Sequence, residues 1–513
     1  MRASTVAVIL LASVMVGGCT SPPNPRTGPD LLGWRLDCGL GLIEAATDPA
    51  WLQDCEARAS HTVGPKQEIW LAVNPTDSQN VVLAAKDNNP ASSAACVWNG
   101  VFVTHDAGAH WKDVTIGGRY SDRKPGELWY GYACNTDPMF RFGADGQLHY
   151  AVEMYNLGGT NSHGPGGPSP QTGRPYIQPG WRLVLATSKD GGDTWPTVVE
   201  LVDGDGTVDL NDYSRMAISP KTGTIIEAIG LLSGTDFTLP AVGAPPQTTD
   251  AATHSYCWVT ASEDHGASAR TPVAVVQNPP QGIACQAIAV SPEGVVVLGG
   301  EVGGSAVGGK EGSGHFSFAT STDDGKSFGA YAGGFDYVSL PGHFNNTRFR
   351  TGTNIEMVYD LTTGPRHGRL YAIYSDFSRG DADILLRTSK DDGATWSQAV
   401  RVNDGGDGSD QFMPNMAVAG DGSLHAFWMD RKHDPQGRLI GITHAVSLDG
   451  EHWQEERVTS VSWDGDLGVH QEGFPFIGDY LGVDAVGNDV WGGFPDASNG
   501  ATTVVAAAHV VKA

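Results

Sequence analysis

The chain has 513 residues, enough for several ordinary domains or for one large repetitive domain. Its 68 Gly and 30 Pro accompany 40% hydrophobic residues, too apolar for a disordered chain and too rich in turn formers for a helical protein. A formal net charge of -26 would repel a polyanion, so we set nucleic-acid binding aside. The composition favours an all-β protein of many short strands joined by turns.

The first element predicted along the chain is a targeting segment. Arg2 is followed by an apolar run that ends in Val-Gly-Gly-Cys at Cys19. This pattern resembles the lipobox of bacterial lipoprotein precursors, which implies a signal peptide over residues 1–18, lipid on Cys19 and a flexible tether over residues 19–30. An ordinary secretory signal with a chance cysteine is the alternative. We expect a protein of the cell envelope, outside the cytoplasm, that meets the membrane only through its N-terminal lipid.

An N-terminal cysteine-containing segment follows over residues 31–65, and a larger region over residues 66–513. Without Cys19 the chain has an even number of cysteines and no CxxC pair. In an exported chain this usage favours disulfides over metal ligands. The six cysteines are Cys38, Cys55, Cys96, Cys134, Cys257 and Cys285.

The larger region repeats the pattern Ser/Thr-x-Asp-x-Gly-x-x-aromatic. In such a turn the Asp and Ser side chains bind backbone N–H groups, Gly accepts the strained φ, and the aromatic ring covers the hairpin. The last repeat lacks one residue, and the repeat that begins at Ser262 lacks the aromatic ring. The six repeats occupy residues 104–111, 188–195, 262–269, 321–328, 389–396 and 447–453.

A strand–turn–strand unit precedes each repeat, for example at residues 69–73 with 81–85. Seven such units accompany the six repeats, and the last unit, residues 480–494, is followed only by the segment 502–511. Radial repetition of small antiparallel sheets protects strand edges that a linear stack would expose. We therefore predict a β-propeller with four-stranded antiparallel blades, and seven is the favoured number of blades.

The repeats resemble the Asp-box (BNR) repeats of the sialidase superfamily, from about Gln67 to the C-terminus. The resemblance implies that each Asp box joins the third and fourth strands of a blade. Sialidase relatives have six blades, so a six-bladed propeller closed by residues 31–63 is the alternative.

In this layout the Asp boxes lie on one face of the propeller, here called the box face. Long insertions at residues 158–180, 234–253 and 299–314 fall between second and third strands, which places them on the opposite face, here called the loop face. Long loops on one face of a rigid scaffold are where function usually resides. The layout also predicts three disulfide pairs, Cys38–Cys55, Cys96–Cys134 and Cys257–Cys285.

Acidic residues are predicted at the loop-face ends of several strands. Asp137 precedes a first strand, and so does Asp479. Such carboxylates suit glycoside chemistry or a cation such as Ca²⁺, whereas capping of turns by Asp is the alternative. Residues 203–209 resemble a calcium loop but lack Gly at the sixth position, so no metal site is assigned and no cofactor is expected. The ends of second strands carry Asp87, Asp376, Asp430 and Asp496.

The resemblance implies a retaining sialidase, with three arginines for the sugar carboxylate, an acid/base carboxyl group and a Tyr nucleophile paired with Glu. Arginine suits this role because its planar fork binds a carboxylate through two bonds. The catalytic candidates are Asp430, Asp376, Tyr480 and Glu472. The substrate-binding candidates are Arg348, Arg350, Arg379, Arg431, Asp87 and Asp496.

Two features depart from that family. The Arg-Ile-Pro-type motif is absent before the first strand, where residues 65–70 read Pro-Lys-Gln-Glu-Ile-Trp. The acidic strand ends would also repel a substrate carboxylate. Whether the chain is an enzyme therefore stays open. The leading hypothesis is a surface-anchored, sialidase-like hydrolase of extracellular glycans, and the alternative is a non-catalytic propeller that binds glycans or a protein partner on its loop face as an envelope scaffold.

Overall fold

The computed structural model describes residues 30–38, 55–61, 64–88, 97–132, 134–155, 181–203, 209–233, 254–275, 283–302, 312–404, 408–459, 461–471, 474–500 and 502–513. None of the helices in these ranges is long and apolar enough to cross a membrane. The predicted signal peptide, Cys19, Cys96 and Glu472 lie outside the described residues. The lipid anchor and the domain boundaries stay predictions.

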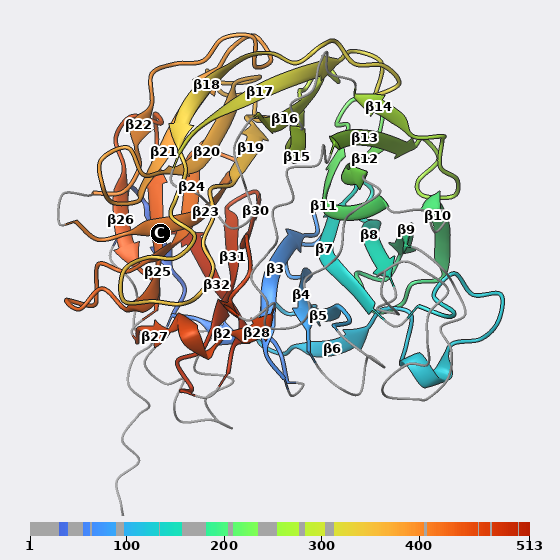
Figure 1. Cartoon of the computed structure of the whole chain (residues 1–513), viewed down its shortest axis with the longest axis horizontal. Coiled ribbons are helices and arrows are strands. Elements are labelled where there is room, and N and C mark those ends of the chain that lie inside the picture. The colour runs from blue at the N-terminus through green and yellow to red at the C-terminus, as the bar shows by residue number, and fades with distance from the viewer. Residues whose placement is uncertain are drawn as a thin grey trace, which may run out of the picture.

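Seven small antiparallel sheets surround a common axis, which confirms the predicted seven-bladed propeller (Figure 1). In blades 1 to 6 the strands follow one another in chain order from the axis outward, so consecutive strands pair. Blade 1 comprises β3 (Lys66–Val73), β4 (Val81–Asp87), β5 (Gly100–Thr104) and β6 (Lys112–Thr115). Blade 2 comprises β7 (Cys134–Phe142), β8 (Leu148–Tyr155), β9 (Trp181–Ser188) and β10 (Thr197–Asp203). Blade 3 comprises β11 (Asp209–Ile218), β12 (Ile225–Ser233), β13 (His254–Ser262) and β14 (Val273–Val275).

The remaining blades follow the same order. Blade 4 comprises β15 (Ile283–Val290), β16 (Val296–Val302), β17 (Ser313–Ser321) and β18 (Ala332–Val338). Blade 5 comprises β19 (Ile355–Tyr359), β20 (Leu370–Asp376), β21 (Asp383–Ser389) and β22 (Val400–Arg401). Blade 6 comprises β23 (Gln411–Val418), β24 (Leu424–Asp430), β25 (Leu439–Ser447) and β26 (Gln454–Arg457), with β27 (Trp463–Asp464) also paired to β25. A hairpin of β28 (Val469–Gln471) and β29 (Phe474–Phe476) precedes blade 7, and short 3-10 helices span Tyr120–Asp122 and Gly465–Leu467.

Blade 7 is closed by the N-terminal segment. Its inner strands are β30 (Gly482–Val486), β31 (Asp489–Asp496) and β32 (Val504–Lys512), and both β1 (Trp34–Leu36) and β2 (Ala57–Arg58) pair with β32. The disulfide Cys38–Cys55 links the two N-terminal pieces. The N-terminal segment therefore supplies the outer edge of the seventh blade, and the six-bladed alternative is wrong.

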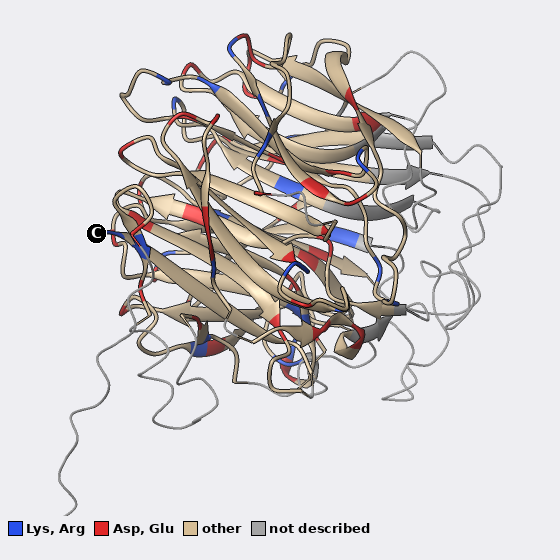
Figure 2. Ribbon diagram, turned by 90° about the vertical axis from the view of Figure 1, so that its left-hand side faces the viewer, with Lys and Arg blue, Asp and Glu red and all other residues tan. Residues whose placement is uncertain are grey.

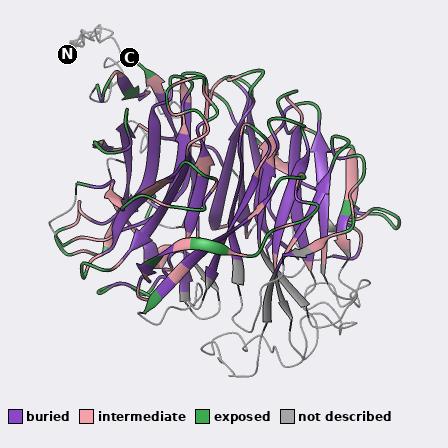
Figure 3. Ribbon diagram, turned by 90° about the horizontal axis from the view of Figure 1, so that it is seen from above, coloured by how far each residue is buried: buried purple, intermediate pink, exposed green. Residues whose placement is uncertain are grey.

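Blades pack face to face, so their strands are apolar on both sides. Every residue of β24 is buried, including Trp428, and every residue of β3 is buried, including Trp70. A strand that is covered on both faces has no side exposed to solvent, so its residues need not alternate between apolar and polar. Figure 3 shows this pattern, with buried strands through the ring and exposed residues concentrated in the turns.

The Asp boxes join third and fourth strands in blades 1 to 6, as predicted. In blade 5, Ser389 Oγ donates to Asp391 Oδ1 (2.8 Å), and the same carboxylate accepts from the Thr395 N–H (2.9 Å). Gly393 has φ of 84°, a left-handed conformation that favours glycine, and its N–H donates to Ser389 Oγ (2.9 Å). The Ser389, Asp391 and Thr395 side chains thus form a local structure whose mutual hydrogen bonds lie within one turn.

Candidate functional site

The first strands of five blades share a β-bulge near their loop-face ends. Their register with the second strand shifts in β3, β7, β11, β15 and β23. Glu68 and Asp137 lie in two of these bulges with φ of 55° and 44°, a region that non-glycine residues rarely adopt. A bulge re-aims side chains, and these two carboxylates consequently meet one lysine.

Lys86, at the end of β4, is the centre of a buried group of charges. Its Nζ lies 2.5 Å from Glu68 Oε2 and 3.0 Å from Asp137 Oδ1. Arg350 forms an ion pair with Asp479. The guanidinium of Arg350 lies 4.3 Å from the centre of the Phe476 ring, and Lys86 Nζ lies 5.6 Å from the same ring centre. We call Glu68, Lys86, Asp137, Arg350 and Asp479 the loop-end cluster.

The segment before blade 7 approaches Glu68 closely. Gly478 has φ of 105°, and a Cβ at this position would lie 2.5 Å from the Glu68 backbone nitrogen. Only glycine fits this approach without displacement of the β3 backbone. The contact places Asp479, the next residue, beside the inner strand of blade 1.

Burial and neighbouring charges set the protonation of the cluster. Burial raises the pKa of Glu68 well above its ordinary value, the charge of Asp137 raises it further, and Lys86 opposes the shift. Burial alone would lower the pKa of Lys86, but Asp137 and Glu68 raise it well above its ordinary value. The cluster therefore combines a carboxyl group of raised pKa with a lysine of raised pKa and further acidic residues. Figure 2 shows that charged residues of both signs occur within strands as well as in turns.

Tyr480, the residue after Asp479, is buried and lies next to the buried Arg215. Arg215 on β11 has its guanidinium 4.9 Å from the centre of the Tyr480 ring and pairs with Glu356 (3.4 Å). The Trp70 ring meets Tyr480 edge-on, with ring centres 5.8 Å apart. Arg215 also donates to the carbonyl oxygens of Gln286 and Ser214, each at 3.0 Å. Of the predicted catalytic residues, Tyr480 is the one that the structure places next to the loop-end cluster.

The predicted aspartates at the ends of second strands each bind residues of the following turn, of their own blade or of the neighbouring blade. Asp376 accepts from the N–H groups of Ser378 and Val338, each at 2.9 Å. Asp430 accepts from the Lys432 N–H (2.9 Å) and from Thr443 Oγ1 (2.8 Å), and Asp496 accepts from the Ser498 N–H (2.9 Å). Asp87 pairs with Lys66 (2.8 Å). These contacts are those of turn-capping and strand-anchoring groups, the alternative that the sequence left open.

The four predicted arginines pair with four different aspartates. Arg348 pairs with Asp466 (3.1 Å), Arg379 with Asp383 (3.3 Å), Arg431 with Asp410 and Arg350 with Asp479. Only Arg350 belongs to the loop-end cluster as defined above. Glu472 lies outside the described residues.

Sequence reasoning missed Glu68, Lys86, Arg141 and Arg215. All four lie inside or near the end of strands. A charged residue within a doubly buried strand was the available signal, because burying an ion is costly without a partner.

The predicted disulfide Cys257–Cys285 is present and joins blade 3 to the first strand of blade 4. Cys134 is also disulfide-bonded. Its predicted partner, Cys96, lies outside the described residues.

Comparisons with known proteins find similarity only to solved structures. No family model matches the chain, and no curated protein matches it. A protein of unknown function from Dyadobacter fermentans DSM 18053 is 12% identical, with 90% of this chain and 99% of that chain covered, at a TM-score of 0.44. Hadza microbial sialidase Hz136 is 14% identical, covering 84% and 76% of the respective chains, at a TM-score of 0.44. An α-L-arabinanase of Penicillium chrysogenum, complexed with arabinobiose, is 14% identical, covering 73% and 91%, at a TM-score of 0.42. At these values the similarities carry no argument about the site.

Proposed function

We propose that the protein hydrolyses extracellular glycans and that the loop-end cluster is its acid–base centre. The supporting observation is the buried carboxyl group of Glu68 beside Asp137 and Lys86. Glycoside hydrolysis needs a carboxyl group that still carries its proton near neutral pH and a second carboxyl group that is ionised. Burial, which raises the pKa of Glu68, favours the first condition at this residue.

Asp479 is the further ionisable group that the reaction can use. It forms an ion pair with Arg350, and both side chains are 19% exposed, so solvent reaches the cluster from their side. In the proposed reaction Glu68 protonates the leaving oxygen of the glycoside. Asp479 then stabilises the positive charge that develops on the sugar or activates the attacking water.

We propose a neutral glycan rather than a sialic acid as the substrate. The arginines that could bind a sugar carboxylate are spread over four separate ion pairs. Tyr480 is buried against Arg215 and Trp70, and in this proposal it positions Arg215 rather than attacking the sugar.

The decisive experiment is hydrolysis of a panel of fluorogenic neutral and acidic glycosides by the mature protein. Active protein should lose about 10²- to 10⁴-fold in kcat on the change Glu68→Gln, which removes the proton donor at nearly constant shape. Glu301→Gln is the matched control, because Glu301 is also buried and bonds Gln286 and Tyr337 instead of the cluster. Absence of hydrolysis across the whole panel would remove the enzymatic proposal.

A second function, glycan or protein binding without hydrolysis, is favoured by the burial of the cluster. Glu68 and Asp137 are each 2% exposed, and their shared lysine links the inner strands of blades 1 and 2. A buried ionic network of this kind can serve the fold alone. Retention of a glycan on the wild-type protein, with no product released, would identify this function.

We also propose that the mature protein is held in the cell envelope by lipid on Cys19. The support is the lipobox in the sequence, and the disulfides of the propeller are typical of proteins outside the cytoplasm. Cells expressing the wild-type chain should incorporate labelled palmitate into it, and Cys19→Ala should abolish the label and release the protein from the membrane fraction. Equal labelling of both proteins would contradict the anchor.

A further inference from the structure

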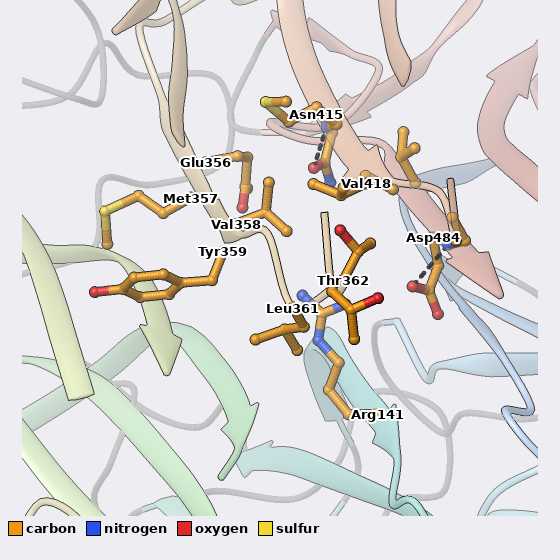
Figure 4. A pocket seen from close by; sticks show the side chains of 16 residues that line it. Arg141, Glu356, Met357, Val358, Tyr359, Leu361, Thr362, Asn415, Val418 and Asp484 are labelled. Atoms are coloured by element: carbon orange, nitrogen blue, oxygen red, sulfur yellow. Dashed lines mark hydrogen bonds between the residues drawn. The ribbon is translucent and has the colours of Figure 1, made fainter. Parts of the chain in front are cut away.

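A cavity of about 510 Å³ lies at the other end of the axis, toward the box face. Its walls come from the box-face halves of the inner strands β7, β19, β23 and β30 and from the turn at residues 361–363 (Figure 4). This volume is within the range of small-molecule sites, roughly 300–1,000 Å³. The cavity uses none of the residues of the loop-end cluster.

Arg141 is the distinctive residue of this cavity. Figure 4 shows its side chain extending from β7 toward Leu361 and Thr362. The Trp70 ring supports the guanidinium, with its centre 5.0 Å away. Among the residues that the structure describes, the guanidinium has no hydrogen-bond or ion-pair partner. A partly buried guanidinium without an anion is costly, and a bound anion would remove that cost.

The carboxyl groups of the cavity already have partners other than Arg141. Asp484 accepts from the N–H groups of Val73 and Ala485, each at 2.9 Å, and Glu356 pairs with Arg215 (3.4 Å). Burial raises the pKa of both carboxyl groups, while Arg141 opposes the shift. Protonation of either group leaves the cavity with an excess of positive charge and adds an O–H donor for a ligand.

The rest of the wall is largely apolar. Met357, Val358, Val418 and Val483 line the cavity. Leu361, also a lining residue, is 51% exposed, an unusual exposure for a large apolar side chain in this protein. A guanidinium fork within an apolar wall matches a ligand that has one anionic head and an apolar body.

We propose that this cavity is a binding site for a small organic carboxylate, whose head pairs with Arg141 and whose apolar body lies against Leu361, Val418 and Val483. The site is separate from the glycan-hydrolysing centre proposed above, and neither proposal depends on the other.

Calorimetric titration of the mature protein with benzoate tests the site, and benzamide is the uncharged ligand of the same shape. Benzoate should bind saturably at millimolar concentration, and benzamide should bind about 10- to 100-fold more weakly, because it lacks the charge that pairs with arginine. Failure of benzoate to bind, or equal binding of the two ligands, would overturn the proposal.

Variants locate the binding. Arg141→Gln should weaken benzoate about 10- to 100-fold, and Leu361→Glu, at the exposed mouth, should weaken it without disturbing the core. Arg348→Gln and Glu68→Gln should leave benzoate affinity unchanged, because those residues lie outside the cavity. Unchanged affinity in Leu361→Glu would overturn the proposal even if Arg141→Gln failed to fold.

Discussion

The two ends of the propeller axis differ in how their buried charges are partnered. At the loop end, Lys86 contacts both Glu68 and Asp137 within a buried group. At the box end, Arg141 faces a cavity whose carboxyl groups, Glu356 and Asp484, bind other partners. The first arrangement is complete within the chain and suits a pre-organised chemical centre, whereas the second becomes complete only when a ligand binds. The two sites lie on the same propeller axis and differ in whether their buried charges have partners within the chain.

The largest expected effect comes from removal of the cation at the loop end. Lys86→Met should lower the free energy of unfolding by about 3–5 kcal/mol, because it leaves two buried carboxyl groups together without a positive charge. Urea unfolding of the two proteins measures the change. Lys112→Met is the control, since its pair with Asp193 is exposed and should contribute less than about 1 kcal/mol. A cost below that control value at Lys86 would show that the cluster is not a tightly coupled group.

A smaller loss of stability is expected when an Asp box, on the box face and away from the axis, is disrupted. Asp391→Ala removes the hydrogen bonds from Ser389 and Thr395 and should lower the free energy of unfolding by about 1–2 kcal/mol. Lys390→Ala, at the adjacent exposed position, should change it by much less. Glycoside hydrolysis and benzoate binding should be unaffected, and a loss of either would mean that the boxes act beyond their own blades.

The two regions should also differ in the pH dependence of stability. In the blade 4 box, burial would raise the pKa of Asp323, but hydrogen bonds from Ser321 and Ser327 lower it to about 2. This stabilisation is complete above the unfolded-state pKa near 3.9 and is lost as the pH falls through about 2. Asp323→Asn should therefore flatten the unfolding free energy between about pH 4 and pH 2, by a small amount because the carboxylate is exposed.

Glu68 should give stability a pH dependence of the opposite sign to that of Asp323. Its raised pKa means that the folded protein keeps a proton that the unfolded chain releases near pH 4.3, so stability falls as the pH rises above that value. Glu68→Gln should make this decline smaller, as measured by urea unfolding at a series of pH values, while other buried carboxyl groups of raised pKa, such as Glu227 and Asp484, still contribute to it. An unchanged decline in the variant would contradict a raised pKa at Glu68.

The smallest effect is expected at Arg348. Its side chain is 69% exposed and pairs with Asp466, so Arg348→Gln should change the unfolding free energy by less than about 1 kcal/mol. Hydrolysis of neutral glycosides should also be unchanged. A large loss of activity in this variant would favour the arginine set that the sialidase resemblance implies and would count against a neutral substrate.

The sequence by itself determined the architecture. An Asp box is encoded within eight residues, because the Asp391 side chain binds Ser389 and Thr395 of its own turn. Counting such local units and the strand pairs before them yielded the number of blades and the strands that the boxes join. The pairing of Cys257 with Cys285 also followed from the order of strands along the chain.

The tertiary structure alone decided which charges meet on the axis. Glu68, Lys86, Asp137 and Asp479 come from blades 1, 2 and 7, and bulges in β3 and β7 turn two of these side chains toward their common lysine. The aspartates that the repeat pattern picked out instead cap their own turns. The physical reason is the range of the interactions. A turn is stabilised by neighbours in the chain, whereas the loop-end cluster joins residues of different strands and blades that only tertiary packing brings together.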